Sequence, residues 1–276
     1  IVGLAVKGYI KIEETKKEGM VFDSTDYFLA KLKDPDDNLS RFEKMLIEKI
    51  FSGSMPGVMV SDMKNKFYTS LDILKETLYG EIIRKGYFLR NPETVRSLYI
   101  AAGIAVMVVA GFAAVVFSPY SMGKNIIAGI LTGIPVLAFS RVMPAKTRAG
   151  AAAYMDILGF QEFMNRAEKD KLERMNDKEL FSNFLPYAIA LDVADNWAKA
   201  FEGVYQETPQ WYVSPGGFRT FTPYSFSSSI SSMASSMGSA IYSTPRGSGI
   251  SGGSGGFGGG GGSSGGGFGG GGGGSW

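Results

Sequence analysis

The sequence contains no histidine and no cysteine. Without these residue types the chain has no Cys/His zinc site, no Ser-His or Cys-His nucleophile pair, no thiol redox centre and no disulfide. Any catalysis would depend on Asp, Glu, Lys, Tyr or Ser. No arrangement of these residues stands out, so we expect neither an enzyme nor a bound cofactor or metal ion.

An excess of one charge is also missing. The chain has 28 basic and 26 acidic residues, a net charge of +2. The balance is local: residues 1–96 hold 16 basic and 15 acidic side chains, and residues 141–202 hold 9 and 10. Nucleic-acid-binding domains generally have a strongly basic face. The composition therefore argues against a nucleic-acid partner, and nothing in it indicates a small-molecule substrate.

The middle of the chain contains two uncharged apolar stretches. The first, residues 98–117, has twenty residues dominated by Ala, Val, Ile, Gly, Met and Phe. As a helix it would be roughly 30 Å long, the thickness of the hydrocarbon core of a bilayer. A soluble core helix of this length normally has a polar stripe, which is missing here. The first stretch is predicted to be a transmembrane helix.

The second apolar stretch, residues 126–139, is shorter and contains Pro135. Its uncharged window would span only about 24 Å as a helix, so a re-entrant or interfacial segment is an alternative to a full crossing. Snorkelling of Lys124 and Arg141 could accommodate the mismatch. We favour a transmembrane helical hairpin over residues 97–140, which keeps both soluble parts on the same side.

Basic residues on both sides of the two stretches predict the orientation. The connecting loop offers only Lys124, whereas the flanks contain Arg84, Lys85, Arg90, Arg96, Arg141, Lys146 and Arg148. By the positive-inside rule both flanks are cytoplasmic. The predicted location is the plasma membrane, with several passes and cytoplasmic soluble segments.

The segment before the membrane, residues 1–96, has the pattern of a winged-helix-like α+β fold. The apolar run at its start is too short for a signal-peptide core, and we interpret it as the end of a helix from a longer precursor. We then expect an alternating β-hairpin over residues 10–33 and an amphipathic helix over 39–51. A short strand over 58–60 leads to a helix that Ser61 caps and that begins at residue 62, and a longer helix covers 70–85. Gly86 and Gly8 end similar helix-terminal sequences, which suggests tandem units with the first one truncated.

A winged helix also permits a different function, that of a membrane-tethered DNA-binding regulator. The helix over residues 70–85 would then be the recognition helix. It carries Asp72, Glu76 and Glu81, and these side chains repel phosphate. A surface for protein contact or dimerisation is therefore the favoured interpretation.

The segment after the membrane, residues 141–206, is predicted to be helical. We expect one long helix over 149–175 with a solvated mixed-sign run at its end, a helix that Pro186 kinks or ends, and a packed helix over 188–204. Asp192, Asp195 and Glu202 raise the alternative of a carboxylate-based membrane-associated enzyme. A solvated helix surface explains these three carboxylates equally well.

Residues 207–246 form an aromatic and Ser-rich amphipathic segment, in which apolar residues recur every three or four positions from Phe226 to Ile241. We expect a helix that orders against a membrane surface or a partner, with disorder as the alternative. Residues 247–276 hold 20 of the 38 glycines and are predicted to be disordered. The candidate partner contacts are Trp211, Tyr212, Phe226, Ile230, Met233, Met237, Ile241 and Trp276.

The sequence resembles the YciQ-like predicted membrane protein family, also called domain of unknown function 2207. The matching words, in order, are LAVKGYIKIE (4–13), KLKDP (31–35), GYF (86–88), NPE (91–93), LPYAIAL (185–191), WAKAFE (197–202) and a glycine run ending in Gly-Ser-Trp. The resemblance implies an upstream extracytoplasmic β-rich domain and a preceding membrane helix outside this chain. It implies no reaction, cofactor or catalytic residue.

These observations predict a mainly α membrane protein with a winged-helix-like segment, a membrane hairpin, a helical C-terminal segment and a Gly-rich tail. The expected role is that of a non-enzymatic integral membrane protein that acts through protein–protein interaction or scaffolding. Its expected partners are the lipid bilayer and either other proteins or further copies of itself.

Overall fold

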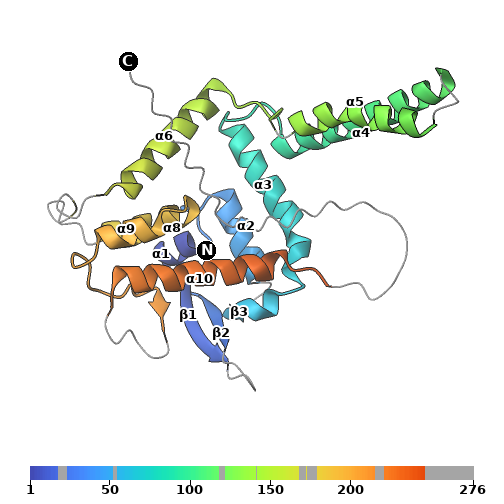
Figure 1. The fold of residues 1–276 in the computed structure, drawn as a ribbon. Helices are drawn as coiled ribbons and strands as arrows, with labels where there is room; N and C mark the ends of the chain where they lie inside the picture. Colours follow the sequence, from blue (N-terminus) through green and yellow to red (C-terminus); the bar gives the residue numbers. More distant parts are fainter. Residues whose placement is uncertain are drawn as a thin grey trace, which may run out of the picture. The chain divides into compact units, whose positions relative to one another are not determined.

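The computed structural model describes residues 1–17, 24–51, 55–117, 122–140, 142–167, 172, 179–214 and 221–245. The described part is mainly helical, as predicted, with one small mixed sheet (Figure 1). Contacts within Ile1–Thr244 place these residues in a single compact unit. The predicted disordered tail, residues 247–276, lies outside the described residues.

The sheet has four strands in the order β3-β2-β1-β4. The hairpin of β1 (Ile10–Lys17) and β2 (Ser24–Lys31) was predicted from its alternating pattern, and the strands pair antiparallel from Ile10↔Lys31 to Lys17↔Ser24. The short strand β3 (Gly57–Met59) adds antiparallel to β2, and β4 (Tyr212–Val213) adds parallel to β1. Every second residue points to one buried face, which includes Ile10, Ile12, Tyr27 and Leu29.

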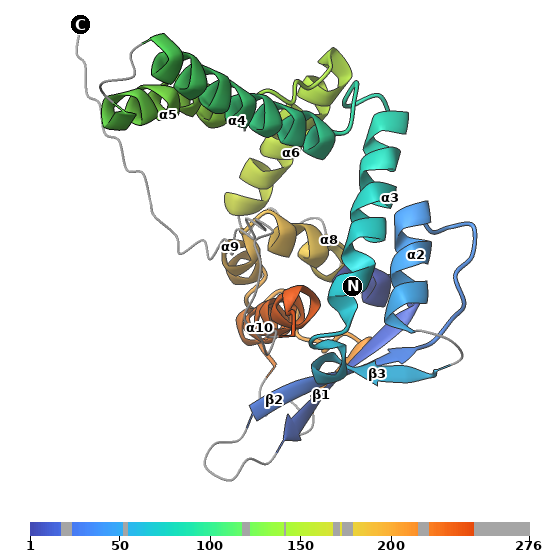
Figure 2. The ribbon, with the colours of Figure 1, turned by 90° about the vertical axis from the view of Figure 1, so that its right-hand side faces the viewer.

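Helices cover that buried face, and in sequence they come from both sides of the two apolar stretches (Figures 1 and 2). From before it come α1 (Val2–Val6), α2 (Arg41–Ile50) and α3 (Leu71–Arg84); from after it come α8 (Glu179–Ala190), α9 (Ala194–Ala200) and α10 (Pro223–Tyr242). Trp197, Phe181 and Phe226 are fully buried at the centre of the shared core. The segments that the sequence separates therefore fold around one hydrophobic core.

The two Gly-capped helix ends are the same structural motif. Gly8 and Gly86 have φ of 76° and 74°. At each end the following Tyr N–H bonds the carbonyl five residues back, and the glycine N–H bonds the carbonyl three residues back. This is a Schellman cap, which favours glycine because of its left-handed backbone. The sequence similarity that suggested tandem winged helices is explained by this cap.

The structure does not confirm the tandem winged-helix arrangement. After Gly86, the described chain makes only an isolated antiparallel bridge between Phe88 and Lys146 in place of a β-hairpin. The helix predicted to start after Ser61 is instead a short 3₁₀ turn, η1 (Val60–Met63), followed by a second one, η2 (Phe67–Ser70). Ser61 does not cap it: the Ser61 N–H donates to the Asp26 carboxylate at 3.2 Å.

Three helix boundaries after the two apolar stretches differ from prediction. The long helix is α6 (Arg148–Asn165), and the mixed-sign run that was expected to extend it falls largely outside the described residues. Helix α8 continues through Pro186 because Leu185 and Ala188 on either side are fully buried, and tertiary packing outweighs the lost hydrogen bond. The predicted helix 188–204 is broken at Asp192, whose φ of 58° turns the chain into α9.

Candidate functional site

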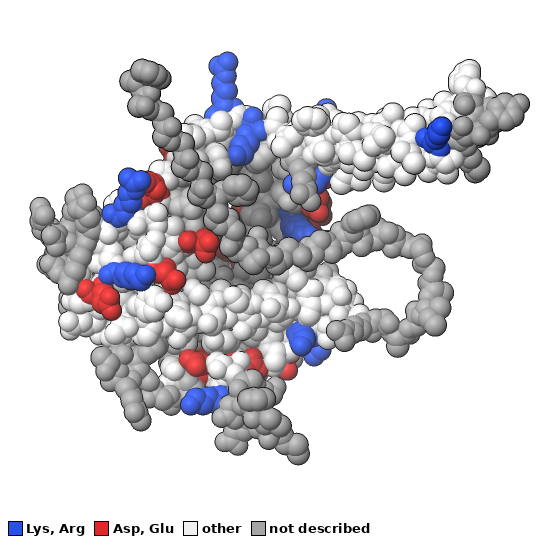
Figure 3. Space-filling model, viewed as in Figure 1, with Lys and Arg blue, Asp and Glu red and all other residues white. Residues whose placement is uncertain are grey.

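The two apolar stretches form long helices with an exposed apolar surface. Helix α4 (Pro92–Phe117) is long and apolar enough to cross a membrane, and only 6% of its most apolar window is buried. Helix α5 (Met122–Phe139) is also apolar but shorter than α4. Phe112 is 72% exposed and Val109 is 68% exposed. Figure 3 shows the surface of this pair as almost entirely uncharged, which is the surface that a helix in lipid requires.

Glycines allow α4 and α5 to approach closely. A Cβ added to Gly129 would lie 2.7 Å from Gly111 Cα, and one added to Gly133 would lie 2.8 Å from the Gly103 carbonyl oxygen. The side chain of Leu137 in α5 also packs over Gly103 in α4. The contacts run in opposite directions along the two helices, so the pair is antiparallel. Small residues at such an interface are typical of helix pairs in membranes, where backbone proximity replaces the hydrophobic effect.

The entry and exit of this helical pair are joined to each other. The Thr147 N–H donates to the Tyr87 carbonyl at 3.1 Å, and the Thr147 hydroxyl donates to the Gly86 carbonyl at 2.6 Å. The same hydroxyl accepts the Gly150 N–H at 3.0 Å and so caps α6. Gly150 itself packs against Tyr87, because a Cβ there would lie 2.2 Å from the Tyr87 oxygen. We call this set of contacts the clasp.

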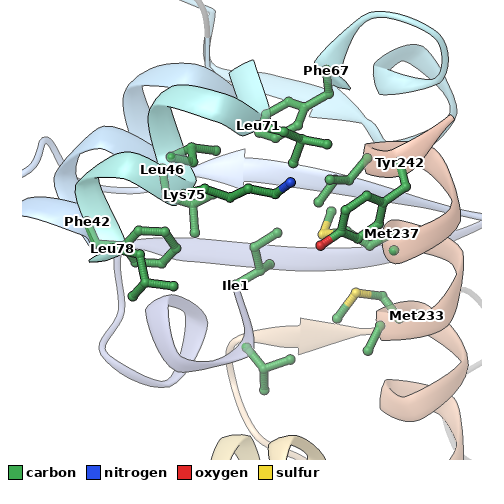
Figure 4. A pocket seen from close by; sticks show the side chains of 15 residues that line it. Ile1, Phe42, Leu46, Phe67, Leu71, Lys75, Leu78, Met233, Met237 and Tyr242 are labelled. Carbon is green, nitrogen blue, oxygen red and sulfur yellow. The ribbon is translucent and has the colours of Figure 1, made fainter. Parts of the chain in front are cut away.

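A second feature is an apolar groove of about 430 Å³ between α3 and α10 (Figure 4). Its residues come from the start of the chain, α2, η2, α3 and α10; all are apolar or glycine except Lys75 and Tyr242. In Figure 4 the Lys75 side chain extends from α3 and the Tyr242 side chain from α10, and their polar ends point toward each other. Few convergent polar groups in an apolar hollow of this size are typical of a binding site.

The candidate partner contacts are placed inside the chain more than on its surface. The α10 stripe packs against the protein's own helices, where Phe226, Ile230, Met233 and Met237 are buried. The expectation that this helix orders against a membrane or partner is therefore not what the structure shows: it orders against α9 and η1. Tyr212 is buried at β4, Trp211 packs half-buried against the core, and Trp276 lies outside the described residues.

Part of the stripe nevertheless borders the groove. Met233, Met237 and Ile241 form its α10 wall. The opposite wall was not singled out by sequence reasoning, although Leu71, Leu74 and Leu78 recur at helical spacing along α3. Such spacing is typical of a buried helix face. The structure shows that this face of α3 is only partly covered.

Two hydroxyl groups beside the core bond to one carboxylate. The Tyr212 hydroxyl donates to Glu14 at 2.8 Å, and the Ser214 hydroxyl donates to the same oxygen at 3.0 Å. Burial and then the hydrogen bond to Glu14 raise the pKa of Tyr212, which keeps the phenol neutral. These bonds join β4 to β1 and have a structural role.

The three carboxylates of the enzyme alternative are exposed, and none of them lines the groove. Asp192 lies in the turn before α9, Asp195 in the first turn of that helix, and Glu202 beyond its end. Among the described residues no group of three or more His, Cys, Asp or Glu side chains could hold a metal ion. The described geometry therefore adds no support to the enzyme alternative.

Comparison with known proteins supports the membrane assignment. Residues 1–201 match the family model described as predicted membrane protein (DUF2207), C-terminal domain. No curated protein and no solved structure shows significant similarity. The matched range includes α4, α5 and the clasp, together with the helices that form most of the core. The chain belongs to the DUF2207 family of predicted membrane proteins, of which it contains the C-terminal domain.

Proposed function

We propose that this chain is a non-enzymatic membrane-anchored interaction module. In this proposal α4 and α5 cross the bilayer as a hairpin. The remaining helices and the sheet form a cytoplasmic body, and its apolar groove binds an amphipathic segment of a protein partner. The observation that carries the proposal is the clasp between Tyr87 and Thr147, because it holds both ends of the apolar helical pair together.

Two crossings fit the contacts better than one. If α4 crossed alone, the residues after it would lie on the opposite side of the membrane from Tyr87. The 3.1 Å bond from Thr147 to Tyr87 joins the two flanks, which supports their placement on the same side. The glycine contacts pair residues 129–137 of α5 with residues 103–111 of α4, which supports a path of α5 alongside α4 in the membrane. Tilt or local thinning compensates for the shorter helix.

The orientation follows from the charges at the two ends. The described flanks hold basic residues on both sides of the hairpin, whereas Lys124 is the single charged residue in 97–140. Positive residues remain on the cytoplasmic side during insertion. The body, with its groove, then faces the cytoplasm, where other proteins are accessible to it.

The chemistry of the groove defines its partner. An apolar lining favours aliphatic or aromatic side chains spaced along one helix face. The groove's single charged lining residue, Lys75, favours a partner segment with an acidic residue beside the apolar ones. The proposed partner is therefore an amphipathic acidic helix.

Site-specific photo-cross-linking in native membranes tests the interaction. A photoreactive phenylalanine analogue replaces Leu78 or Tyr242 at the groove edge, and Leu32, which is also exposed, serves as the control position. We expect the same discrete adduct from both groove positions, none from Leu32, and loss of the adduct when Lys75→Glu is added. Adducts that are identical at all three positions, or unaffected by Lys75→Glu, would contradict the proposal.

A further inference from the structure

Six basic side chains gather at the base of the α4–α5 hairpin. They lie in residues 84–96 and 142–148, where Glu93 is the single acidic residue, and all six are exposed: Arg84, Lys85, Arg90, Arg96, Lys146 and Arg148. We call them the basic collar. Such a concentration contrasts with the balanced charge of the rest of the chain.

The clasp creates the collar from two distant parts of the sequence. Phe88 and Lys146 form an antiparallel bridge, and Thr147 bonds to Gly86 and Tyr87. The bridge places the cations that precede α4 beside those that follow α5. The collar therefore brings together cations from both flanks of the hairpin.

Among the described residues, no acidic side chain forms an ion pair with a collar cation. None of the ion pairs between described residues involves one of them. The ammonium group of Lys146 lies 3.3 Å from the ring centroid of Tyr154, an attraction that does not neutralise its charge. Glu81 in α3, the nearest acid in sequence to Arg84, accepts the Phe42 N–H at 2.9 Å. The positive charge is thus available to an external anion.

Exposed apolar side chains are near the collar cations in the sequence. Leu89 is 80% exposed and adjoins Arg90; Val142 is 71% exposed and lies in the segment that leads to Lys146. The phosphate backbone of a nucleic acid would leave these side chains in water. A membrane surface accommodates both kinds of group, because cations meet headgroups while apolar side chains reach the acyl region.

We infer that the basic collar binds the phosphate headgroups of anionic phospholipids in the cytoplasmic leaflet. The inference rests on the proposed hairpin topology. Clustered Lys and Arg next to a membrane helix attract anionic lipid, and Arg forms paired hydrogen bonds with phosphate oxygens. The collar would enrich such lipids around the hairpin and hold its base at headgroup level.

Electron paramagnetic resonance of spin-labelled lipids tests this inference. The full chain is reconstituted into phosphatidylcholine vesicles that contain a trace of spin-labelled phosphatidylglycerol or spin-labelled phosphatidylcholine. The motionally restricted fraction gives the relative association constant of each lipid with the protein. We expect phosphatidylglycerol to associate about twofold or more over phosphatidylcholine, and this preference to weaken at ~1 M salt.

Matched variants locate the effect. The triple variant Arg84→Gln, Lys85→Gln, Arg148→Gln should reduce the preference towards one. The control Lys33→Gln, Lys64→Gln, Lys66→Gln removes equal charge from exposed lysines that lie outside the collar, two of them beyond the far end of α3, and should retain the preference.

The outcomes separate the two claims. A restricted fraction of equal size for both lipids would overturn the collar inference while supporting the membrane anchor. No restricted fraction for either lipid would overturn the membrane anchor itself. A preference lost equally in the collar and control variants would also contradict the inference, since it would reflect total charge alone.

Discussion

Thr147 donates a backbone hydrogen bond to Tyr87 across 60 positions of sequence, and all of the apolar hairpin lies between them. The same threonine caps α6 through the Gly150 N–H. One residue therefore closes the base of the hairpin and starts the helix that leads back to the body. In the proposed topology, this relationship keeps both ends of the hairpin on one side of the membrane.

Replacing Thr147 should loosen this junction. The variant Thr147→Val keeps the side-chain shape but loses the hydroxyl bonds to Gly86 and Gly150. We expect a loss of about 1 kcal/mol in the free energy of unfolding, measured by thermal unfolding in lipid nanodiscs. Thr77→Val is the control, because the Thr77 hydroxyl bonds only the carbonyl of Ile73 within its own helix. Equal effects of the two variants would show that the hydroxyl bonds of Thr147 do not stabilise the clasp.

The close approach of α4 and α5 predicts a size limit at Gly129. In Gly129→Val the new side chain would meet the Gly111 backbone, whose Cα lies 2.7 Å from the Cβ position. Backbone cannot move aside as a flexible side chain can, so we expect separation of the helices at a cost of about 1–3 kcal/mol. Sodium dodecyl sulfate titration of mixed micelles, followed by circular dichroism, measures it. Gly123→Val, with open space at its Cβ, should have little effect.

The α10 helix should be part of the protein's own core. Phe226→Ala empties a fully buried position that contacts the rings of Phe181 and Tyr212. We expect a loss of about 3–5 kcal/mol in the free energy of unfolding. Tyr224→Ala, on the exposed side of the same helix, should cost far less. Near-equal values would mean that α10 is not packed as described.

The hydrogen bond between Tyr9 and Asp36 predicts a pH effect. The Tyr9 hydroxyl donates to the Asp36 carboxylate at 2.6 Å, and this bond, followed by the Asn38 N–H, lowers the pKa of Asp36. Because the folded pKa is below the unfolded value of about 3.9, the added stability is present above that value. It is lost as the pH falls through the folded pKa.

Tyr9→Phe should therefore reduce the pH dependence of the unfolding midpoint below about pH 4. Thermal unfolding of the reconstituted chain between about pH 3 and 6 measures the slope. Asp36→Asn removes the titrating group and should flatten the slope at least as much. An unchanged slope in Tyr9→Phe would show that the bond does not couple Asp36 ionisation to folding.

The elements that local patterns indicate were predicted well. The β1–β2 hairpin, α2, α3, α4 and the stripe of α10 follow from alternation, helical spacing and the composition of the apolar run. The family was also predicted correctly from short words in order, and the family match confirms it. Boundaries shifted by a few residues where caps or turns decide them, as at Asp192.

Features that depend on distant pairing could not be predicted. Strand β4 has two residues without an alternating pattern, and it is defined by pairing with β1 about 200 positions away, as the Glu14–Ser214 bond illustrates. The stripe of α10 indicated an apolar face without indicating what covers it. The clasp depends on Tyr87 backbone geometry, which no side-chain pattern records. The groove likewise exists because α3 and α10 are not fully packed against each other, which only the positions of both helices show.

The absence of cysteine makes the topology directly measurable. Single cysteines are introduced at the exposed residues Glu76, before the hairpin in sequence, and Asp156, after it. A third is introduced at Gly123, at the start of α5. Intact cells are then treated with a membrane-impermeant maleimide. The account predicts that Gly123→Cys is labelled from outside, while Glu76→Cys and Asp156→Cys are labelled only after the membrane is permeabilised. Labelling of Glu76→Cys and Asp156→Cys from opposite sides would contradict the account.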